Sequence, residues 1–443
     1  MMILLGEGTV FTRDAARPMI TRGAVVMDGG RIEAVGSYDE LRKTYPQATV
    51  IPAHGKIIMP GFINAHHHIY SALARGLSIP GNNPTNFNEI LEGLWFFLDR
   101  HLKRDDVWAS AVATYMACIE NGVTTIFDHH ASYGETAGSL SVLAEVAKQF
   151  GVRSCLCYEV SDRNGQAAME EAVAENVRFG KEAAKDPAHL AAMFGLHASF
   201  TLSPETLAYV REANTDKLGY HIHVAEGASD EADSIEKYGL RTVERLYQEG
   251  ILGPNTIAGH CIHVDAAEIN RLKETDTMVV HNPESNMGNA VGAPDILAMY
   301  KAGIRLALGT DGYTSDMLES YKVANCLVKH RSGLPNQGWG EIPTMLFENN
   351  RRIAGQFLKA EVGIIKEGAA ADVIVMDYDP PTPMTADNLN GHLLFGTNGL
   401  NVITTISDGV VRMQDRQLVG LDKAALNAQV RDIAVGLWKR LVP

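Results

Sequence analysis

The chain has 443 residues, of which 46% are hydrophobic and 21% are charged, as in an ordinary globular protein. That length exceeds one ordinary core and suits one large domain with a smaller second one. The formal net charge of −14 argues against nucleic acid or an anionic membrane as a partner. No apolar run approaches the roughly 20 residues that a membrane-spanning helix needs.

Residues 1–56 contain short apolar runs with glycine and aspartate turns, as in "GAVVMDGGRIEAVG". This pattern predicts antiparallel strands. The first apolar patch is too short, and too soon interrupted by charge, to be a signal peptide. Five cysteines in so long a chain do not form a disulfide framework, so we expect a reducing, cytoplasmic location.

Residues 57–365 repeat one pattern, in which a short apolar run ends in polar residues and a stretch with helical spacing follows. Strands that alternate with helices predict a parallel sheet. Eight repeats favour an α/β fold of the closed (β/α)₈ barrel type. A Rossmann fold is less well supported, because no G-x-G-x-x-G follows an early strand. The eight runs are "KIIMPGFINAHHH", "VTTIFDHH", "RSCLCYEVSD", "AAMFGLHASF", "LGYHIHVAE", "TIAGHCIH", "DTMVVHNPES" and "RLALGTDG".

Residues 366–443 return to short strand-like runs, "ADVIVMDYD" and "VITTISDGVVRMQ". These again indicate antiparallel β structure. Neither this segment nor residues 1–56 is long enough for a good core of its own. We therefore expect the two segments to pair into one small β-sandwich beside the barrel.

The ends of the predicted strands carry the chemistry, because a (β/α)₈ barrel forms its active site at the carboxyl ends of its strands. His or Asp stands at seven of the eight run ends. In "NAHHHIY", side chains alternate across the strand, so His66 and His68 share one face while His67 points to the other. This H-x-H pair can offer two imidazoles to one metal ion.

The fifth run, "HIHVAE", contains a second H-x-H pair. His223 lies nearer the strand end than His221, so we expect His223 to be a ligand and His221 to pack one layer deeper. Glu226 lies beyond the strand, where a loop can place it over the metal ion.

The sixth and eighth runs end in His260 and Asp311. Taken singly, His260 can be a core histidine and Asp311 a helix cap. A metal site explains the whole set better, and we predict that its ligands are His66, His68, His223 and Asp311.

Other candidates concern the substrate. His129 and His130 in "DHHAS" face opposite ways, and we take His130 as the candidate substrate contact. Trp95 in "LEGLWFFLDR" can stack on a flat ring or pack in the core. Ser315 can contact the substrate or cap the helix after the eighth strand.

Several motifs together resemble the amidohydrolase superfamily, in the aminohydrolase branch that includes cytosine, guanine, 8-oxoguanine and S-adenosylhomocysteine deaminases and triazine hydrolases. They are "PGFINAHHH", "HIHVAE", "AGHCIH", "HNPESNMGNAVG", "LGTDGYTSD" and "VGIIKEGAAADVIVMD". More narrowly, "HHHIYSALARG", "LWFFLDR" and "IFDHHAS" resemble the aminohydrolase group called SsnA.

The resemblance implies a distorted TIM barrel with a small β-sandwich, often assembled as a homodimer or larger homo-oligomer. It implies one divalent metal ion per subunit, Zn²⁺ first and Fe²⁺ as the alternative, on the four ligands named above. His197 matches a position that often contacts substrate. The fourth run, "GLHASFT", lacks the lysine that bridges two metal ions in binuclear relatives, which favours a mononuclear site. Gly288 and Asn289 stand where many relatives carry Lys-Leu.

These residues suggest hydrolytic deamination of an N-heterocyclic substrate, a purine, pyrimidine or related ring, with release of ammonia. A bound zinc ion can lower the pKa of a water to about 7. Asp311 would accept the proton of that water, and Glu226 would protonate the ring nitrogen. His260 would hydrogen-bond the developing charge.

Two alternatives remain open. The chain can be a cyclic amidohydrolase, or a triazine-type hydrolase that removes another group such as chloride. It can also be a metal-binding assembly partner without catalysis, although a structural metal site needs neither Glu226 nor His260.

Overall fold

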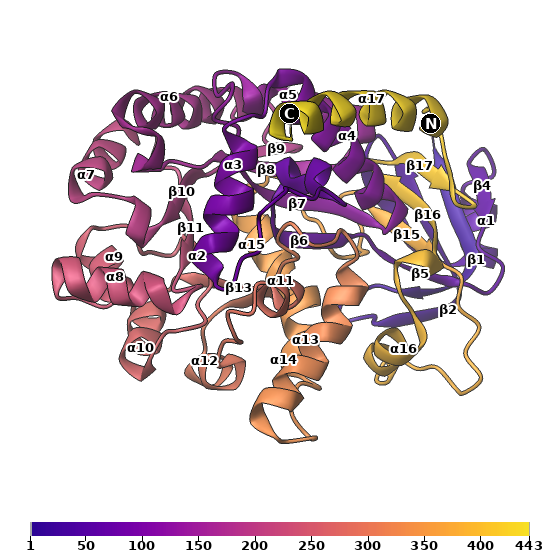
Figure 1. The fold of residues 1–443 in the computed structure, drawn as a ribbon. Coiled ribbons are helices and arrows are strands. Elements are labelled where there is room, and N and C mark those ends of the chain that lie inside the picture. Colours follow the sequence, from indigo (N-terminus) through magenta and orange to yellow (C-terminus); the bar gives the residue numbers. More distant parts are fainter. Residues whose placement is uncertain (1, 443) are drawn as a thin grey trace.

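The computed structural model describes residues 2–442. It is an α/β fold in which two sheets of parallel strands lie beside a third sheet (Figure 1). The first parallel sheet has the order β6 (Phe62–His67), β7 (Val123–His130), β8 (Arg153–Tyr158) and β9 (Leu190–Ala192). The second has the order β10 (Phe194–Ala198), β11 (Tyr220–Val224), β12 (Ile257–His260), β13 (Met278–His281) and β14 (Leu306–Leu308). Each of the eight predicted runs thus contains a strand.

The two parallel sheets approach one another at both ends of the strand order. An isolated parallel bridge joins Val160 to Leu196, and another joins His67 to Asp311. The amides of Thr310 and Asp311 each donate a 3.0 Å hydrogen bond to the carbonyl of His66. The carboxyl end of β6 is therefore held against the residues that follow β14.

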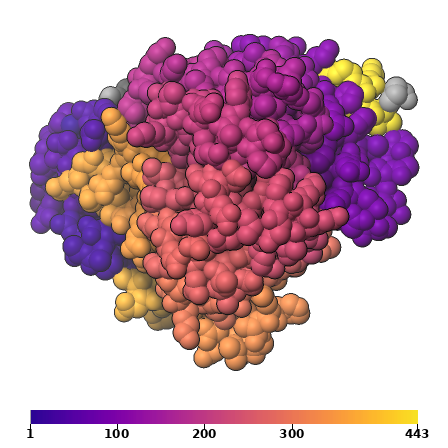
Figure 2. Space-filling model, turned by 90° about the vertical axis from the view of Figure 1, so that its left-hand side faces the viewer, coloured from indigo at the N-terminus to yellow at the C-terminus, as the bar shows by residue number. Residues whose placement is uncertain are grey.

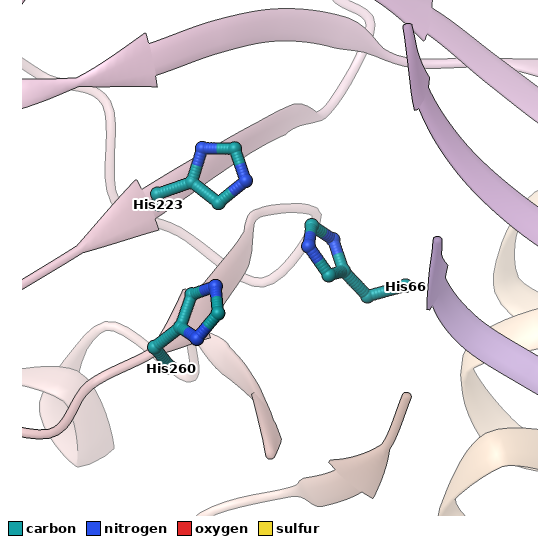
Figure 3. A group of neighbouring side chains, drawn as sticks. All are labelled: His66, His223 and His260. Atoms are coloured by element: carbon teal, nitrogen blue, oxygen red, sulfur yellow. The ribbon is translucent and has the colours of Figure 1, made fainter. Parts of the chain in front are cut away.

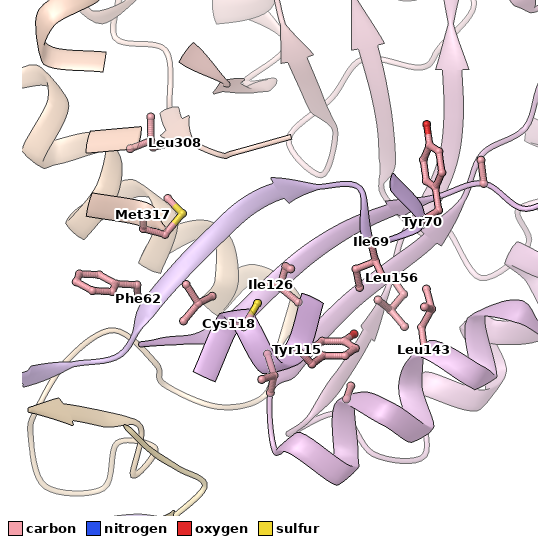
Figure 4. Packing of buried hydrophobic residues seen from close by; sticks show 14 of the residues in the cluster. Phe62, Ile69, Tyr70, Tyr115, Cys118, Ile126, Leu143, Leu156, Leu308 and Met317 are labelled. Carbon is pink, nitrogen blue, oxygen red and sulfur yellow. The ribbon is translucent and has the colours of Figure 1, made fainter. Parts of the chain in front are cut away.

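Helices cover these strands on the outside (Figure 1). Their apolar faces bury against the strands, which is the main source of stability for such layers. Figure 4 shows Tyr115, Cys118 and Leu143 of the helices packed with Ile126 and Leu156 of the strands. The helices are α4 (Arg104–Glu120), α5 (Ser139–Phe150), α6 (Gln166–Ala183), α7 (Pro204–Ala213), α8 (Ala228–Tyr238), α9 (Thr242–Gln248), α10 (Ala266–Glu274), α12 (Ile296–Ala302), α13 (Met317–Ser332) and α15 (Asn350–Phe357).

The N- and C-terminal segments share the third sheet, and Figure 2 shows their indigo and orange surfaces together at one side of the molecule. β5 (Ile57–Pro60) joins them, because it pairs with β1 (Ile3–Phe11) and with β15 (Val373–Met376). The other strands are β2 (Met19–Asp28), β3 (Arg31–Ser37), β4 (Thr49–Pro52), β16 (Val402–Ser407), β17 (Val410–Gln414) and β18 (Gln417–Leu418). Most pairs in this sheet are antiparallel, as predicted, but β1 runs parallel to β4 and β5.

Three features differ from the prediction. The fourth run is divided between two sheets, because β9 belongs to the first parallel sheet and β10 to the second. The first run is not one strand, because the chain leaves the third sheet after β5 and enters the first parallel sheet at β6. Gly61 lies between them, where a Cβ would overlap the Thr124 hydroxyl. The C-terminal segment also contains α16 (Leu389–Gly396) and α17 (Lys423–Leu441). The Asp422 carboxylate caps α17 by accepting a hydrogen bond from the Ala425 amide.

No helix among the described residues is both long and apolar enough to cross a membrane.

Candidate metal and active site

Histidines from neighbouring strand ends converge on one place. Figure 3 shows His66 of β6, His223 of β11 and His260 of β12 pointing toward one another. Candidate ligand atoms within 4.8 Å of one another form overlapping groups. The groups are His66 with His223 and His260, His66 with His68 and Asp311, Glu226 with His260 and Asp311, and His68 with His129 and His223. All four predicted ligands, with Glu226 and His260, are thus brought together.

The imidazoles of His68 and His223 are each oriented by a hydrogen bond from Nδ1 to a backbone carbonyl. His68 Nδ1 lies 2.6 Å from the His129 carbonyl oxygen, and His223 Nδ1 lies 2.9 Å from that of His197. Because a carbonyl only accepts, each Nδ1 must carry the proton, and each Nε2 presents a lone pair to the cluster. The two Nε2 atoms are 3.1 Å apart, and His68 Nε2 is 3.3 Å from Asp311 Oδ1.

The site satisfies the chemical requirements of a divalent metal ion. Nε2 of His66 and of His260 is buried without a hydrogen-bond partner among the described residues. Burial, with neighbouring histidines, lowers the pKa of His66 and of His223 well below the ordinary range. The rings are therefore neutral, which is the metal-binding form. Imidazole nitrogens and a carboxylate are the donors that zinc takes in catalytic sites.

Backbone strain accompanies the cluster. Ala225, His260 and Asp311 have φ values of 48°, 69° and 55°, in the left-handed region that side chains other than glycine rarely adopt. Such conformations cost about 1–3 kcal/mol each and persist where surrounding contacts hold them. Here they stand at or just after the ends of β11, β12 and β14, where the chain must turn a side chain toward the cluster.

The two carboxylates of the cluster have different environments. Burial alone would raise the pKa of Asp311, but His68, His260 and hydrogen bonds from Ser285 Oγ (2.8 Å) and the Gly312 amide (2.7 Å) lower it overall. Burial, with the nearby charge of Asp311, raises the pKa of Glu226 to about 7, although His260 opposes the shift. One carboxyl is thus suited to stay ionised and the other to carry a proton, the division that acid–base catalysis uses.

A cavity opens over the cluster and holds about 610 Å³ of space, open solvent included. Aromatic side chains from α2 (Phe87–Ile90), η2 (Leu91–Trp95) and α3 (Phe96–Asp99) form much of its wall. Trp95 and His197, both predicted to contact the substrate, line it. The lining consists of His68, Tyr70, Ser71, Phe87, Leu91, Trp95, Phe96, Asp99, Glu159, His197, His223, Glu226, Ser285, Asn289, Asp311, Gly312 and Tyr313.

Two residues predicted to contact the substrate, His130 and Ser315, are not among the residues that line the cavity. His130 is fully buried beside Ser132, whose Oγ lies 3.0 Å from its Nε2. Its neighbour His129 faces the cluster instead, with its ring 4.6 Å from that of His223. Alternation along β7 allows only one of the two to face inward. Ser315 lies outside the cavity lining, with its Oγ 3.5 Å from His67 Nε2.

Sequence reasoning missed several lining residues. Glu159 directly follows β8, so its position at the end of the third run was an available signal. Tyr313 was also missed, because its loop meets the loop of Asn289 only in three dimensions. A Cβ on Gly288 would overlap the Tyr313 hydroxyl, which explains why glycine suits that position.

Comparisons with known proteins agree on the family. The model of the amidohydrolase family matches residues 57–412, and that of the bacterial imidazolonepropionase-like composite domain matches residues 23–48. The chain is 32% identical to a 5-methylthioadenosine/S-adenosylhomocysteine deaminase of Thermococcus sibiricus, over 93% of this chain and 94% of the relative. It is 30% identical to a 5′-deoxyadenosine deaminase of Methanosarcina mazei, over 99% of each.

Solved structures share the fold at lower identity. A zinc-bound adenosine deaminase from Xanthomonas campestris superposes with a TM-score of 0.86 at 23% identity, over 99% of this chain and 98% of the other. A guanine deaminase of E. coli gives a TM-score of 0.78 at 20% identity, over 93% of this chain and 99% of the other. At these identities the likeness concerns the fold. The family match over most of the chain and the relatives at 30% identity or more show that this chain belongs to the amidohydrolase family.

Proposed function

We propose that this protein is a metal-dependent aminohydrolase that releases ammonia from an amino-substituted N-heterocycle, with adenosine derivatives as the first substrates to test. The observation that carries the proposal is the convergence of His66, His68, His223, Asp311 and Glu226 on one cluster, over which the cavity opens. The full-length relatives that are named as deaminases of adenosine derivatives support the choice of substrates.

In this proposal a single divalent ion occupies the cluster. Its ligands would be His66, His68, His223 and Asp311, and the zinc-bound structural neighbour favours zinc over iron(II). When bound, the ion would lower the pKa of a water to about 7 and so make a nucleophile available at neutral pH.

The side chains then divide the proton transfers. Asp311 Oδ2 accepts a proton from the attacking water, because this carboxylate stays ionised beside His68 and His260. Glu226 protonates the ring nitrogen next to the attacked carbon, a task that suits a pKa of about 7. It then takes the remaining proton of the added hydroxyl and passes it to the departing amine, and the proton held by Asp311 restores Glu226 for the next turnover. His260 faces both groups, with its Nε2 3.4 Å from Glu226 Oε2 and 3.4 Å from Asp311 Oδ2.

The hydrogen bonding of His260 limits its role. Its Nδ1 lies 2.8 Å from Asn286 Oδ1, to which it donates. Its Nε2 therefore donates to the developing oxyanion only when the ring carries both protons. In this form His260 stabilises the negative charge of the tetrahedral intermediate.

A screen for released ammonia tests the proposal. Zinc-loaded protein is incubated with adenosine, 5′-deoxyadenosine, guanine, cytosine, a pterin and an aminotriazine, and with a cyclic amide and a chlorotriazine for the two alternatives. Ammonia release from at least one amino-heterocycle is the expected result. Ring opening without ammonia, or chloride release from a chlorotriazine alone, would instead support the cyclic amidohydrolase or triazine alternative.

Broader expectations also remain proposals. We propose that the parallel strands form one distorted barrel over residues 57–365, and that residues 1–56 and 366–443 form the small β-sandwich unit. The shared sheet of the two termini supports this division. A cytoplasmic location, supported by five free cysteines, and a homo-oligomeric state complete the proposal.

A further inference from the structure

The charged residues of the cavity lining have one sign. Asp99, Glu159, Glu226 and Asp311 line the cavity, whereas no lysine or arginine of the described chain does. Glu226 and Asp311 are used by the proposed reaction. Asp99 and Glu159 are not, although both are at least 98% buried.

Only one of the two carboxylate oxygens of Glu159 accepts a hydrogen bond in the structure. Its Oε1 accepts a 2.8 Å hydrogen bond from Arg163. His129 Nδ1 lies 3.8 Å from its Oε2, which is beyond hydrogen-bond distance, and that nitrogen is itself unpaired and buried. Glu159 lines the cavity, and a carboxylate oxygen without a donor in a cavity wall is a site that a ligand can complete.

Arg163 cannot serve an anionic ligand, because its charge is already committed. Its two terminal nitrogens lie 3.1 Å and 2.5 Å from the carboxylate oxygens of Asp99. Its guanidinium carbon lies 4.1 Å from the ring centre of Phe96 and 4.7 Å from that of Tyr133. The guanidinium is thus held between two rings and two carboxylates.

Protonation of Asp99 does not free the charge of Arg163. Burial raises the pKa of Asp99 to about 7. Burial alone would also raise the pKa of Glu159, but His197 and Arg163 lower it overall, so Glu159 stays ionised. Whether or not Asp99 carries a proton, Arg163 stays paired with Glu159, so no side chain of this wall offers an unpaired positive charge to an anion.

We propose that Glu159, held by the Arg163–Asp99 pair, is a specificity residue that accepts a hydrogen bond from a donor or cationic group of the substrate and excludes substrates with a carboxylate or phosphate. This inference rests on the proposed deaminase function and narrows it. Among adenosine derivatives, neutral or amino-bearing ones are preferred over acidic ones. A substrate with a free carboxylate and no cationic group, such as adenosine-5′-carboxylic acid, is expected to be poor.

Three ligands that differ in one group test the proposal. They are 5′-amino-5′-deoxyadenosine, 5′-deoxyadenosine and adenosine-5′-carboxylic acid, each assayed for kcat/KM of ammonia release with zinc-loaded protein. We expect the cationic compound to exceed the anionic one by about tenfold or more, because a unit charge still acts over several ångströms in a cavity of low dielectric. Glu159→Gln should reduce that ratio at least about fivefold, whereas Glu171→Gln, the same change at an exposed position of α6, should leave it unchanged.

The outcomes distinguish the role proposed for Glu159, here called the Glu159 subsite, from the proposed deaminase reaction. If ammonia is released but Glu159→Gln keeps the wild-type ratio, the subsite is wrong and the deaminase function stands. If no ammonia is released, calorimetric Kd values for the same ligands replace kcat/KM, and a cation preference that Glu159→Gln abolishes supports the subsite alone. If Glu159→Gln does not fold, the wild-type ranking decides, and equal or tighter binding of the carboxylic acid overturns the proposal. Failure of all three ligands to bind also overturns it.

Discussion

The histidine cluster and the junction between β8 and the third sheet both bury charged and polar groups. They differ in whether these groups find hydrogen-bond or ion-pair partners within the chain. At the junction, Arg153 lies 2.8 Å from Asp372 Oδ2 and 3.0 Å from Asp408 Oδ1. Asp372 Oδ1 also accepts a 2.7 Å hydrogen bond from the Asp408 amide. At the cluster, Nε2 of His66 and of His260 has no hydrogen-bond partner among the described residues.

The difference indicates what each region does. A fully paired buried network holds one arrangement of the chain, and removing a member leaves the others unpaired. An unpaired buried nitrogen in a native protein calls for an explanation, and a missing ligand is one. The junction therefore reads as structural and the cluster as functional, and the following changes test that reading.

The largest effect is expected from the first strand. His66→Asn should abolish metal binding and activity, because it removes a ligand that points into the cluster. His67→Asn should retain the metal, because His67 belongs to none of the ligand groups and its Nε2 approaches Ser315. Metal content by mass spectrometry decides, and the opposite pattern would show that the strand alternation has been assigned the wrong way round.

A smaller but still large effect is expected at Glu226. Glu226→Gln keeps the size of the side chain but cannot donate the proton, so turnover should fall by roughly 10²–10⁴-fold. Metal content should stay at one ion per chain, because Glu226 is not among the proposed ligands. Ammonia release and metal analysis on the same preparation test this, and unchanged turnover would remove Glu226 from the mechanism.

At the junction we expect loss of stability without loss of chemistry. Asp372→Asn removes a charge that is 1% exposed and lies against Arg153, and it should lower the free energy of unfolding by about 3 kcal/mol. Turnover per folded, metal-loaded molecule should be unchanged. Urea unfolding measures the first quantity, and Asp387→Asn, at an exposed position, is the control. A loss of turnover in the folded variant would contradict the structural role of the junction.

The smallest effect concerns pH. Hydrogen bonding to His189, with the charge of Arg153, lowers the pKa of Asp408 to about 2, below the value of about 3.9 expected in an unfolded chain. Because the folded value is the lower one, this stabilisation is present above the unfolded pKa and is lost as pH falls toward 2. The difference in unfolding free energy between wild type and Asp408→Asn should therefore shrink from pH 5 to pH 2. A difference that stays constant over this range would show that Asp408 does not contribute through its charge.

Local patterns determined much of what the sequence predicted. The eight strands were identified from short apolar runs, and the facing of His66, His68 and His223 followed from alternation along a strand, which is a local property of the backbone. The choice between His221 and His223 also rested on distance from the strand end. In the structure, His221 Nε2 lies 2.7 Å from His66 Nδ1, and His221 is not among the residues that line the cavity.

Nonlocal contacts determined the rest. The break at Gly61 depends on β15, which pairs with β5 from more than 300 residues away in the chain. His129 rather than His130 faces the cluster because neighbouring strands place one side of β7 inward. The α17 helix was missed although Asp422 offers a cap signal, because the short strands before it dominated the pattern.

The sequence by itself determined the family, the parallel strands and the residue types that could hold a metal ion, since each is written in local motifs and spacing. Only the tertiary structure decided which carboxylates share the cavity. Glu159 and Arg163 lie four residues apart, whereas Asp99 comes from a distant segment of the chain. Whether Arg163 faces a ligand or pairs with Asp99 and packs on Phe96 depends on how these two segments pack. The sign of the charge that meets the substrate is therefore a property of the fold.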